Sequence, residues 1–360
     1  MSRMAFVFRM GAALMLGLFL VFTCFSGSFL IFNDFLSANK NSLHPPDEKK
    51  LFHKSLWFDP AFSQENCFSR STVFSINFAH AALLSEQTKE EGASCPAWNI
   101  IVTGLEFGHA PMADGGLGGD SAGIILLRID PAKFNFVLRM ATEEGASFSL
   151  REWSERHNLY AGINASMFLP DNLTSTGYMR SGSHINNPRA GGRLGAFFVS
   201  NPQKKGLPLA DILEHDTVNW REVMEQYALV VQNFRLINKQ GKILWSESGP
   251  AHSIAAVAKD GSGSILFILS QAAMTPAAFA QYIQKLPLDL TSVMYVEGGS
   301  HAGLFLREPH ALRQSRLPGA VSYPVTGGML HIWKGHQSLL NTRSNPEAHL
   351  PNILGIKSVE

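Results

Sequence analysis

The chain has 360 residues, of which 45% are hydrophobic and 16% are charged. This composition is typical of a folded protein rather than a disordered one, and the length fits one large domain or two ordinary ones. The chain carries 30 basic and 29 acidic residues, which gives a formal net charge of +1. A net charge this close to zero creates no field that would attract nucleic acid or an anionic membrane surface. Any anionic substrate therefore has to be held by local contacts.

Residues 11–32 contain no charged side chain, and two arginines precede them. The run is long enough to cross a membrane as a helix, with the arginines on the cytoplasmic side. A cleaved signal peptide is the alternative, because Ser26 and Ser28 are small residues at alternate positions. We favour an uncleaved anchor because the apolar run continues to Phe32. Either interpretation places the main domain in the periplasm or another extracytoplasmic space.

Only two cysteines, Cys67 and Cys95, lie outside the apolar segment. In an oxidising compartment they could form a disulfide, and two free thiols are the alternative. The sequence has no CxxC motif and no Cys/His cluster, so no structural zinc site is predicted.

The predicted fold class is α+β, with a mixed, largely antiparallel sheet, flanking helices, one strand-helix-strand crossover near the C-terminal third and the N-terminal transmembrane helix. The predicted organisation has five parts. They are a cytoplasmic tip with the anchor or signal sequence (1–36), a tether (37–50), an accessory region (51–97), the main domain (98–310) and a C-terminal extension (311–360).

Apolar, β-branched runs predict strands at 98–107, 123–129 and 134–139. The turn sequence at 130–133 predicts that the last two pair antiparallel. The glycine-rich segment 115–120 lacks the Lys and Ser/Thr of a phosphate-binding loop. We interpret it as a mobile hairpin or lid.

Ser149 and Glu152 have the spacing of a capping box, which predicts a helix to about His157. An apolar strand within 159–168 then runs into small residues and Asn164. The amide of Asn164 can donate and accept hydrogen bonds together, so it either faces a ligand or caps a turn.

Residues 174–193 are rich in polar residues and glycine, which indicates a binding loop or a solvated loop. Arg180 is its candidate ligand contact. Further along, the patterns predict a strand at 195–199, a helix at 220–226 and a strand at 228–232 that ends in the amide of Gln232.

The last third has the clearest pattern. It predicts a hairpin of strands 252–258 and 264–269, a helix from Thr275-Pro276 to about Lys285, a strand at 291–296, a short strand at 329–333 and a polar tail. The strand, helix and strand in this order predict that strands 264–269 and 291–296 are parallel.

The stretch 293–302 passes from an apolar run into an acid, two glycines, a serine and a histidine. Glycines permit close approaches that other residues resist, so the three polar side chains could converge on a ligand. These residues are Glu297, Gly298, Gly299, Ser300 and His301.

The order of these motifs resembles the phosphodiester glycosidase family, which includes the enzyme that uncovers mannose 6-phosphate on lysosomal proteins. The resemblance covers roughly Trp98 to Leu306. Its landmarks are Gly162-Ile-Asn164 with Phe168, Gly177 with Gly182, Gly195-Ala-Phe-Phe, Gln232, Lys259-Asp-Gly261 and Glu297-Gly-Gly299.

The chain departs from the family pattern at three places. It has Ala165 and Ser166 where two glycines are common, His252 and Ser253 where an arginine and a threonine would fall, and Glu297 in place of an aspartate. A histidine can donate to a phosphate, but it lacks the fork of a guanidinium and is only partly charged near neutral pH.

The resemblance implies a hydrolase of a glycosyl phosphodiester, with a carbohydrate or glycosyl-phosphate as substrate. Together with the apolar run at 11–32, it predicts that this hydrolase is membrane-anchored and envelope-facing. Such cleavage needs a group that activates water and a group that holds or protonates the leaving phosphate. We assign Glu297 as base or sugar-hydroxyl ligand, and His252 and His301 as phosphate ligands or proton carriers. The expected substrate-binding residues are Asn164, Arg180, Gln232, Gly298, Gly299 and Ser300.

Two alternatives stay open. A glycan-binding or scaffold protein could keep this fold without the chemistry, as the departures at His252 and Glu297 suggest. A metal-dependent phosphodiesterase would use Glu297, His301, His252 and Asp120 as ligands. No close ligand pair such as HxH supports a metal, so no cofactor is predicted, although a divalent metal stays open.

Overall fold

The computed structural model describes residues 96–112, 123–309, 317–326, 328–335 and 348–359. The predicted anchor at 11–32, the tether, the two cysteines and the glycine-rich segment 115–120 lie outside these residues. Within the described part of the chain, no helix is long and apolar enough to cross a membrane.

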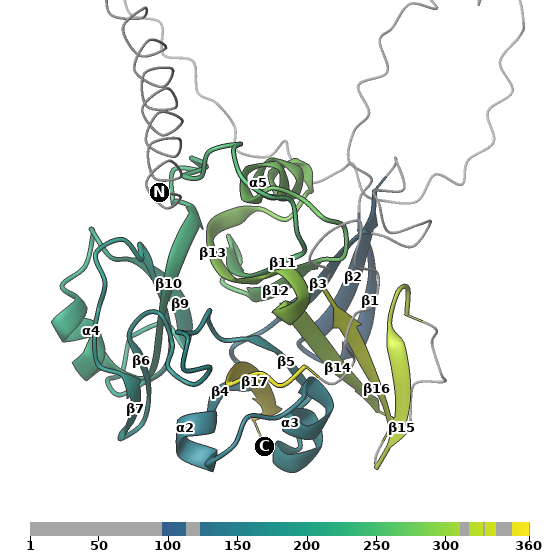
Figure 1. Ribbon diagram of the computed structural model, residues 1–360, viewed down its shortest axis with the longest axis horizontal. Helices are drawn as coiled ribbons and strands as arrows, with labels where there is room; N and C mark the ends of the chain where they lie inside the picture. The colour runs from purple at the N-terminus through teal and green to yellow at the C-terminus, as the bar shows by residue number, and fades with distance from the viewer. Residues whose placement is uncertain (1–95, 113–122, 310–316, 327, 336–347, 360) are drawn as a thin grey trace, which may run out of the picture. The chain divides into compact units, whose positions relative to one another are not determined.

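The described strands form two sheets (Figure 1). In the first, the strand order is β1 (Ala97–Val102), β2 (Leu105–Pro111), β3 (Gly123–Ile129), β12 (Ile265–Ser270), β11 (Ile254–Asp260), β13 (Leu290–Gly298), β10 (Tyr227–Ile237), β6 (Met179–Ser181) and β7 (His184–Asn187). β8 (Ala196–Pro202) pairs with β10 and with β9 (Ala210–Glu214).

In the second sheet, the order is β15 (Val321–Val325), β16 (Gly328–Lys334), β14 (Gly303–Pro309), β5 (Ala161–Asn164), β17 (Asn352–Ser358) and β4 (Phe134–Met140). The pairings within it are antiparallel. The chain is therefore a sheet-dominated α+β protein with two antiparallel sheets, where the sequence predicted one sheet.

The main core contains residues of both sheets, so it lies between them. Alternate residues of β11 enter different cores: Ala255 and Val257 face the core between the sheets, while Ile254 and Ala256 face a second core. Because both faces of β11 are covered, its sequence is apolar almost throughout instead of alternating. The uninterrupted apolar run of β3 has the same cause.

Few helices cover the sheets. α5 (Pro276–Lys285) begins at Thr275, whose side chain accepts from the amide of Ala278, and it packs Phe279 and Ile283 against the second core (Figure 1). α3 (Leu150–His157) begins with the predicted capping box and buries Trp153. The other helices among the described residues are α2 (Ala141–Glu144), α4 (Trp220–Gln226) and the 3₁₀ turn η2 (Gly299–His301).

Two strand predictions are wrong. The run 98–107 is a hairpin of β1 and β2, because Gly104 takes the left-handed angle of φ +82° and reverses the chain. β3 and β4 do not pair: β3 lies between β2 and β12, and β4 pairs with β17 in the other sheet. The turn at 130–133 carries the chain between sheets, and a local turn signal does not specify which edge a strand reaches.

The predicted parallel direction of the strands around α5 is confirmed. β12 and β13 both run antiparallel to β11, which lies between them, so they point the same way without being neighbours. The predicted polar tail is wrong for residues 352–358, because β17 pairs with β4 on one side and with β5 on the other. Strands from the predicted C-terminal extension thus share a sheet with β5.

Candidate active site

The carboxyl group of Glu297 lies at the end of β13, where the pairing with β11 is irregular. Glu297 is opposite Ala255 and Tyr295 is opposite Ala256, so one extra residue of β13 is accommodated between them. Such bulges redirect side chains at strand ends. Because Ala255 belongs to the core between the sheets, Glu297 is largely withdrawn from water and is only 7% exposed.

Burial controls the protonation of Glu297. Desolvation raises the pKa of this carboxyl to about 8, although the backbone amide of Gly298, 2.9 Å from Oε1, donates to it and opposes the shift. Near neutral pH the carboxyl group is therefore mostly protonated. In that form it can donate a proton or a hydrogen bond, which an ordinary surface glutamate cannot do.

Two further polar groups converge on Gly298. A Cβ added there would lie 2.1 Å from the hydroxyl oxygen of Tyr295 and 2.6 Å from Cε1 of His252. Only a residue without a side chain leaves room for both groups. Burial, and next the charge of Glu297, raise the pKa of Tyr295, so its hydroxyl stays protonated.

The ring of His252 has a preferred tautomer. Its Nδ1 lies 2.9 Å from the backbone oxygen of Ser253. Because a carbonyl oxygen can only accept, the neutral ring carries its proton on Nδ1, and Nε2 keeps a lone pair. His252 can thus accept a proton at Nε2.

Aromatic rings pack around Tyr295 on the face of β13 that covers the second core. Trp245 stacks on Tyr295 with 5.1 Å between ring centroids, and Phe234 meets Trp245 edge-on at 5.6 Å. Trp245 also donates from Nε1 to the backbone oxygen of Arg235. These contacts hold the Tyr295 ring beside His252, whose ring centroid is 6.4 Å away.

Asn164 connects β5 to the segment after β13. Its Nδ2 donates to the backbone oxygen of His301 at 2.9 Å, and its Oδ1 accepts from the amide of Gly303 at 2.8 Å. The side chain is buried. Asn164 therefore fixes the position of η2, and its predicted substrate contact stays a prediction.

η2 holds Gly299, Ser300 and His301 in a tight turn. Gly299 has φ +71°, and its amide donates to the backbone oxygen of Ser253 at 2.8 Å. His301 is exposed, and its ring meets Phe168 edge-on at 5.4 Å. Ser300 is half-buried. The turn thus presents the His301 imidazole to solvent at the end of β13.

Gln232 on β10 and Arg180 on β6 make hydrogen bonds to the backbone of neighbouring segments. Gln232 is fully buried and bonds through both side-chain atoms to the backbone of Gly191 and Leu194. Arg180 donates to the backbone oxygens of Met224 and Tyr227. These bonds secure the loops around β6 and α4, and the predicted substrate contacts of both residues stay predictions.

Sequence reasoning missed Tyr295 and Asn233. Asn233 is fully buried, and its Nδ2 donates to the backbone oxygen of Ala165 at 2.8 Å. Its Oδ1 is buried without a hydrogen-bond partner among the described residues. A buried amide in an apolar strand was the available signal, since alternation turns Asn233 toward the face opposite Gln232. Tyr295 looked like an ordinary core residue within an apolar run.

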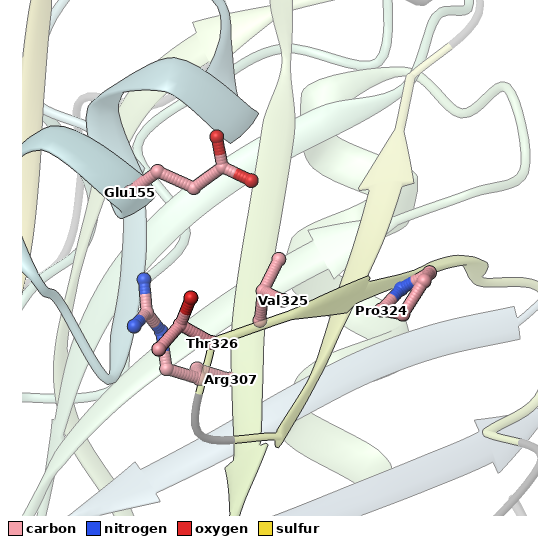
Figure 2. Close-up of a pocket in the computed structure, with 5 residues that line it drawn as sticks. All are labelled: Glu155, Arg307, Pro324, Val325 and Thr326. Atoms are coloured by element: carbon pink, nitrogen blue, oxygen red, sulfur yellow. The ribbon is translucent and has the colours of Figure 1, made fainter.

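Two cavities lie elsewhere on the described surface. One has a volume of about 650 Å³ and is lined by Glu155, Arg307 and three residues near the end of β15, as Figure 2 shows. The other, of about 230 Å³, lies beside Lys259 and the 262–264 turn. Neither is lined by a predicted site residue.

The metal-dependent alternative requires Glu297, His252, His301 and Asp120 as ligands. Within the described residues, no three His, Cys, Asp or Glu side chains are placed to hold a metal ion. Asp120 lies outside those residues.

Two antiparallel sheets with a buried acid at the end of a central strand define a sheet-rich α+β protein with a candidate acid-base site. A family model described as phosphodiester glycosidase matches residues 157–357. This match covers more than half of the chain, so the chain belongs to the phosphodiester glycosidase family. The matched region includes β5, β13, η2 and β17.

The solved structures that align with the chain are distant in sequence. A hypothetical protein from Synechocystis aligns at 13% identity and a TM-score of 0.46, over 74% of this chain and 64% of that chain. The match thus spans less than two thirds of the Synechocystis protein. No curated protein sequence matches the chain.

Two further structures align at lower scores. One is the catalytic domain of zebrafish N-acetylglucosamine-1-phosphodiester alpha-N-acetylglucosaminidase, auto-inhibited by its pro-peptide, at 11% identity and a TM-score of 0.41, covering 70% of this chain and 86% of that chain. The other is an exported protein from Burkholderia pseudomallei, at 8% identity and a TM-score of 0.39, covering 67% and 75% respectively.

Proposed function

We propose that the chain hydrolyses a glycosyl phosphodiester at the end of β13. Membership of the phosphodiester glycosidase family supports the reaction class. The observation that carries the proposal is the buried carboxyl group of Glu297, whose pKa is raised to about 8. A carboxylic acid that is protonated at neutral pH is what a general acid for glycosidic cleavage requires.

In the proposed reaction, the bond between the anomeric carbon and the phosphate oxygen breaks. Glu297 donates its proton to that oxygen, and the phosphate leaves as a monoester. A water molecule attacks the anomeric carbon and gives its proton to Nε2 of His252. This assignment replaces the base role first expected for Glu297, because its carboxyl group is mostly protonated before substrate binds.

Other residues around η2 have supporting roles in this proposal. The Tyr295 hydroxyl and the exposed His301 imidazole are available to hydrogen-bond the phosphate. Asn164 keeps η2 in place through its bonds to His301 and Gly303.

Glu297→Gln tests the acid role directly. The amide has almost the same shape but cannot donate a proton as an acid, so we expect turnover of a glycosyl phosphodiester to fall by about 100-fold or more. Glu247→Gln is the matched control, because Glu247 is exposed and remote from β13 in sequence. Undiminished turnover in the folded Glu297→Gln protein would exclude the acid role.

We further propose that the reaction takes place outside the cytoplasm, on a protein anchored by residues 11–32. The uncharged run and its preceding arginines support this location. In intact cells, external protease should then cleave the main domain only after the outer barrier is opened. Protection of the domain after that treatment would contradict the location.

A glycan-binding protein without turnover is the second candidate. His252 replaces an arginine expected from the family pattern, and imidazole holds phosphate less firmly than a guanidinium. Binding of glycans together with no detectable turnover of sugar phosphodiesters would favour this candidate.

A further inference from the structure

A second set of hydrogen-bonded side chains lies in the other sheet, on β14, β16 and β15. The hydroxyl of Ser322 lies 2.8 Å from Nδ1 of His331, and Nε2 of the same ring lies 2.8 Å from Oε2 of Glu308. Nothing in the proposed glycosidase reaction uses these three residues.

The strand register puts the three side chains on one face of the sheet. Ser322 is directly opposite His331 in the β15–β16 pair, and His331 is directly opposite Leu306 in the β14–β16 pair. Glu308 is two residues beyond Leu306, so it shares the face of Leu306. The arrangement is therefore set by three paired strands rather than by a loop.

The carboxylate of Glu308 determines which nitrogen of His331 carries the proton and which accepts. An ionised Glu308 can only accept, so the proton of the ring lies on Nε2 and Nδ1 keeps its lone pair. That lone pair faces the hydroxyl of Ser322 and can take its proton. Hydroxyl, imidazole and carboxylate in this sequence are the parts of an activated serine nucleophile.

The burial of the three residues also suits a reaction at the serine. His331 is 1% exposed and Glu308 is 2% exposed, whereas Ser322 lies on the surface. Water therefore does not compete for the ring and the carboxylate, and the hydroxyl can meet a substrate.

The edge of the sheet beside Ser322 offers backbone groups to a substrate. Among the described strands, β15 pairs only with β16, so its outer edge leaves backbone amides free to bind an oxyanion. The cavity of about 650 Å³ lies on the other face of this sheet, because Arg307, which lines it together with Glu155 of α3, alternates with Leu306 and Glu308 along β14 (Figure 2).

We propose that Ser322, His331 and Glu308 form a second catalytic site that cleaves carboxylic esters. The Ser322 oxygen attacks the ester carbonyl carbon, and its proton passes to Nδ1 of His331. The carbon–oxygen bond to the alcohol then breaks, and the alcohol leaves with that proton. Water attacks the resulting serine ester, the acid leaves, and the serine hydroxyl is restored.

The test is covalent labelling of the purified full-length chain with a fluorophosphonate, followed by intact mass and peptide mapping, together with hydrolysis of p-nitrophenyl acetate. We expect one adduct, on Ser322. Ser322→Ala should abolish it, and Glu308→Gln should slow labelling by about 10-fold or more. Ser248→Ala is the matched control, since Ser248 is an exposed serine whose described hydrogen bond is to another serine.

An unlabelled Ser322 in the folded parent protein would overturn the proposal, and so would a folded Glu308→Gln protein that is labelled at the parental rate. If Glu308→Gln unfolds, the test compares the rates at which the new thiols of Ser322→Cys and Ser248→Cys are alkylated. Faster alkylation at position 322 by about 10-fold supports proton transfer to His331, and equal rates refute it.

Discussion

Glu297 has two properties that are linked at the level of one residue. Its position at the end of β13 withdraws the carboxyl group from water, and this burial keeps it protonated up to a pKa of about 8. Burial disfavours the ionised form of this carboxyl group, so the folded protein is most stable while Glu297 is protonated. The same group that would serve the reaction therefore makes stability depend on pH.

Stability should fall as the pH rises from 5 to 8. In this range the folded protein holds a proton on Glu297 that the unfolded chain, with an ordinary carboxyl pKa, has released. The loss should be about 3 kcal/mol for this group. Urea unfolding at both pH values measures it, and Glu297→Gln should remove that part of the pH dependence. An unchanged dependence in the variant would show that Glu297 is not the responsible group.

A methyl group at Gly298 should disturb the site more than the fold. The backbone at Gly298 is extended, with φ −141°, so alanine fits the backbone but meets the Tyr295 hydroxyl and the His252 ring. We expect Gly298→Ala to cost about 1–3 kcal/mol of unfolding free energy and to lower turnover.

Two controls isolate the cause of the Gly298 effect. Adding Tyr295→Phe removes the nearest atom and should restore part of the lost stability. Gly192→Ala, where a Cβ meets no atom within 4 Å, should be neutral. If Gly298→Ala were as harmless as Gly192→Ala, the convergence on Gly298 would be disproved.

At the scale of elements, the bond network of Asn164 joins β5 to η2. Asn164→Asp keeps an acceptor for the Gly303 amide but removes the donor to the His301 carbonyl, and places an oxygen there instead. We expect a loss of about 1–3 kcal/mol in unfolding free energy, measured by urea denaturation. Asn135→Asp, on the exposed face of β4, is the control and should change little.

Elements with local signals were predictable from the sequence. The capping box of α3, the Thr275-Pro276 start of α5 and the β11–β12 hairpin are fixed by residues close together in the chain. Strand partners were not predictable in the same way. β4 pairs with β17 rather than with β3. Which strand it pairs with depends on burial between the two sheets and not on the turn between β3 and β4.

In the candidate site, too, local patterns predicted individual residues but not their surroundings. Glycines and polar residues at strand ends pointed to Glu297, His252 and Asn164, but they did not reveal what surrounds these groups. Tyr295 lies beside Gly298 and His252, in a part of β13 where the bulge changes the register with β11. The raised pKa of Glu297 likewise depends on burial by distant segments.

At the scale of the whole molecule, β17 completes the second sheet between β4 and β5. Removing residues 352–360 should leave both strands with open edges and expose the core between the sheets, so we expect aggregation or unfolding. Circular dichroism and gel filtration measure this. Removing only residues 359–360 is the control and should preserve the fold. A monomeric, folded protein without β17 would contradict the prediction.

The place of β17 has a consequence for folding in time. β4 and β5 are synthesised early, yet the strand that separates them comes from the far end of the described chain. Until that strand is made, both edges have no correct partner and can pair with other molecules. The large loop that must close also slows folding. Chaperones that protect exposed strand edges during translation should therefore raise the yield of folded protein.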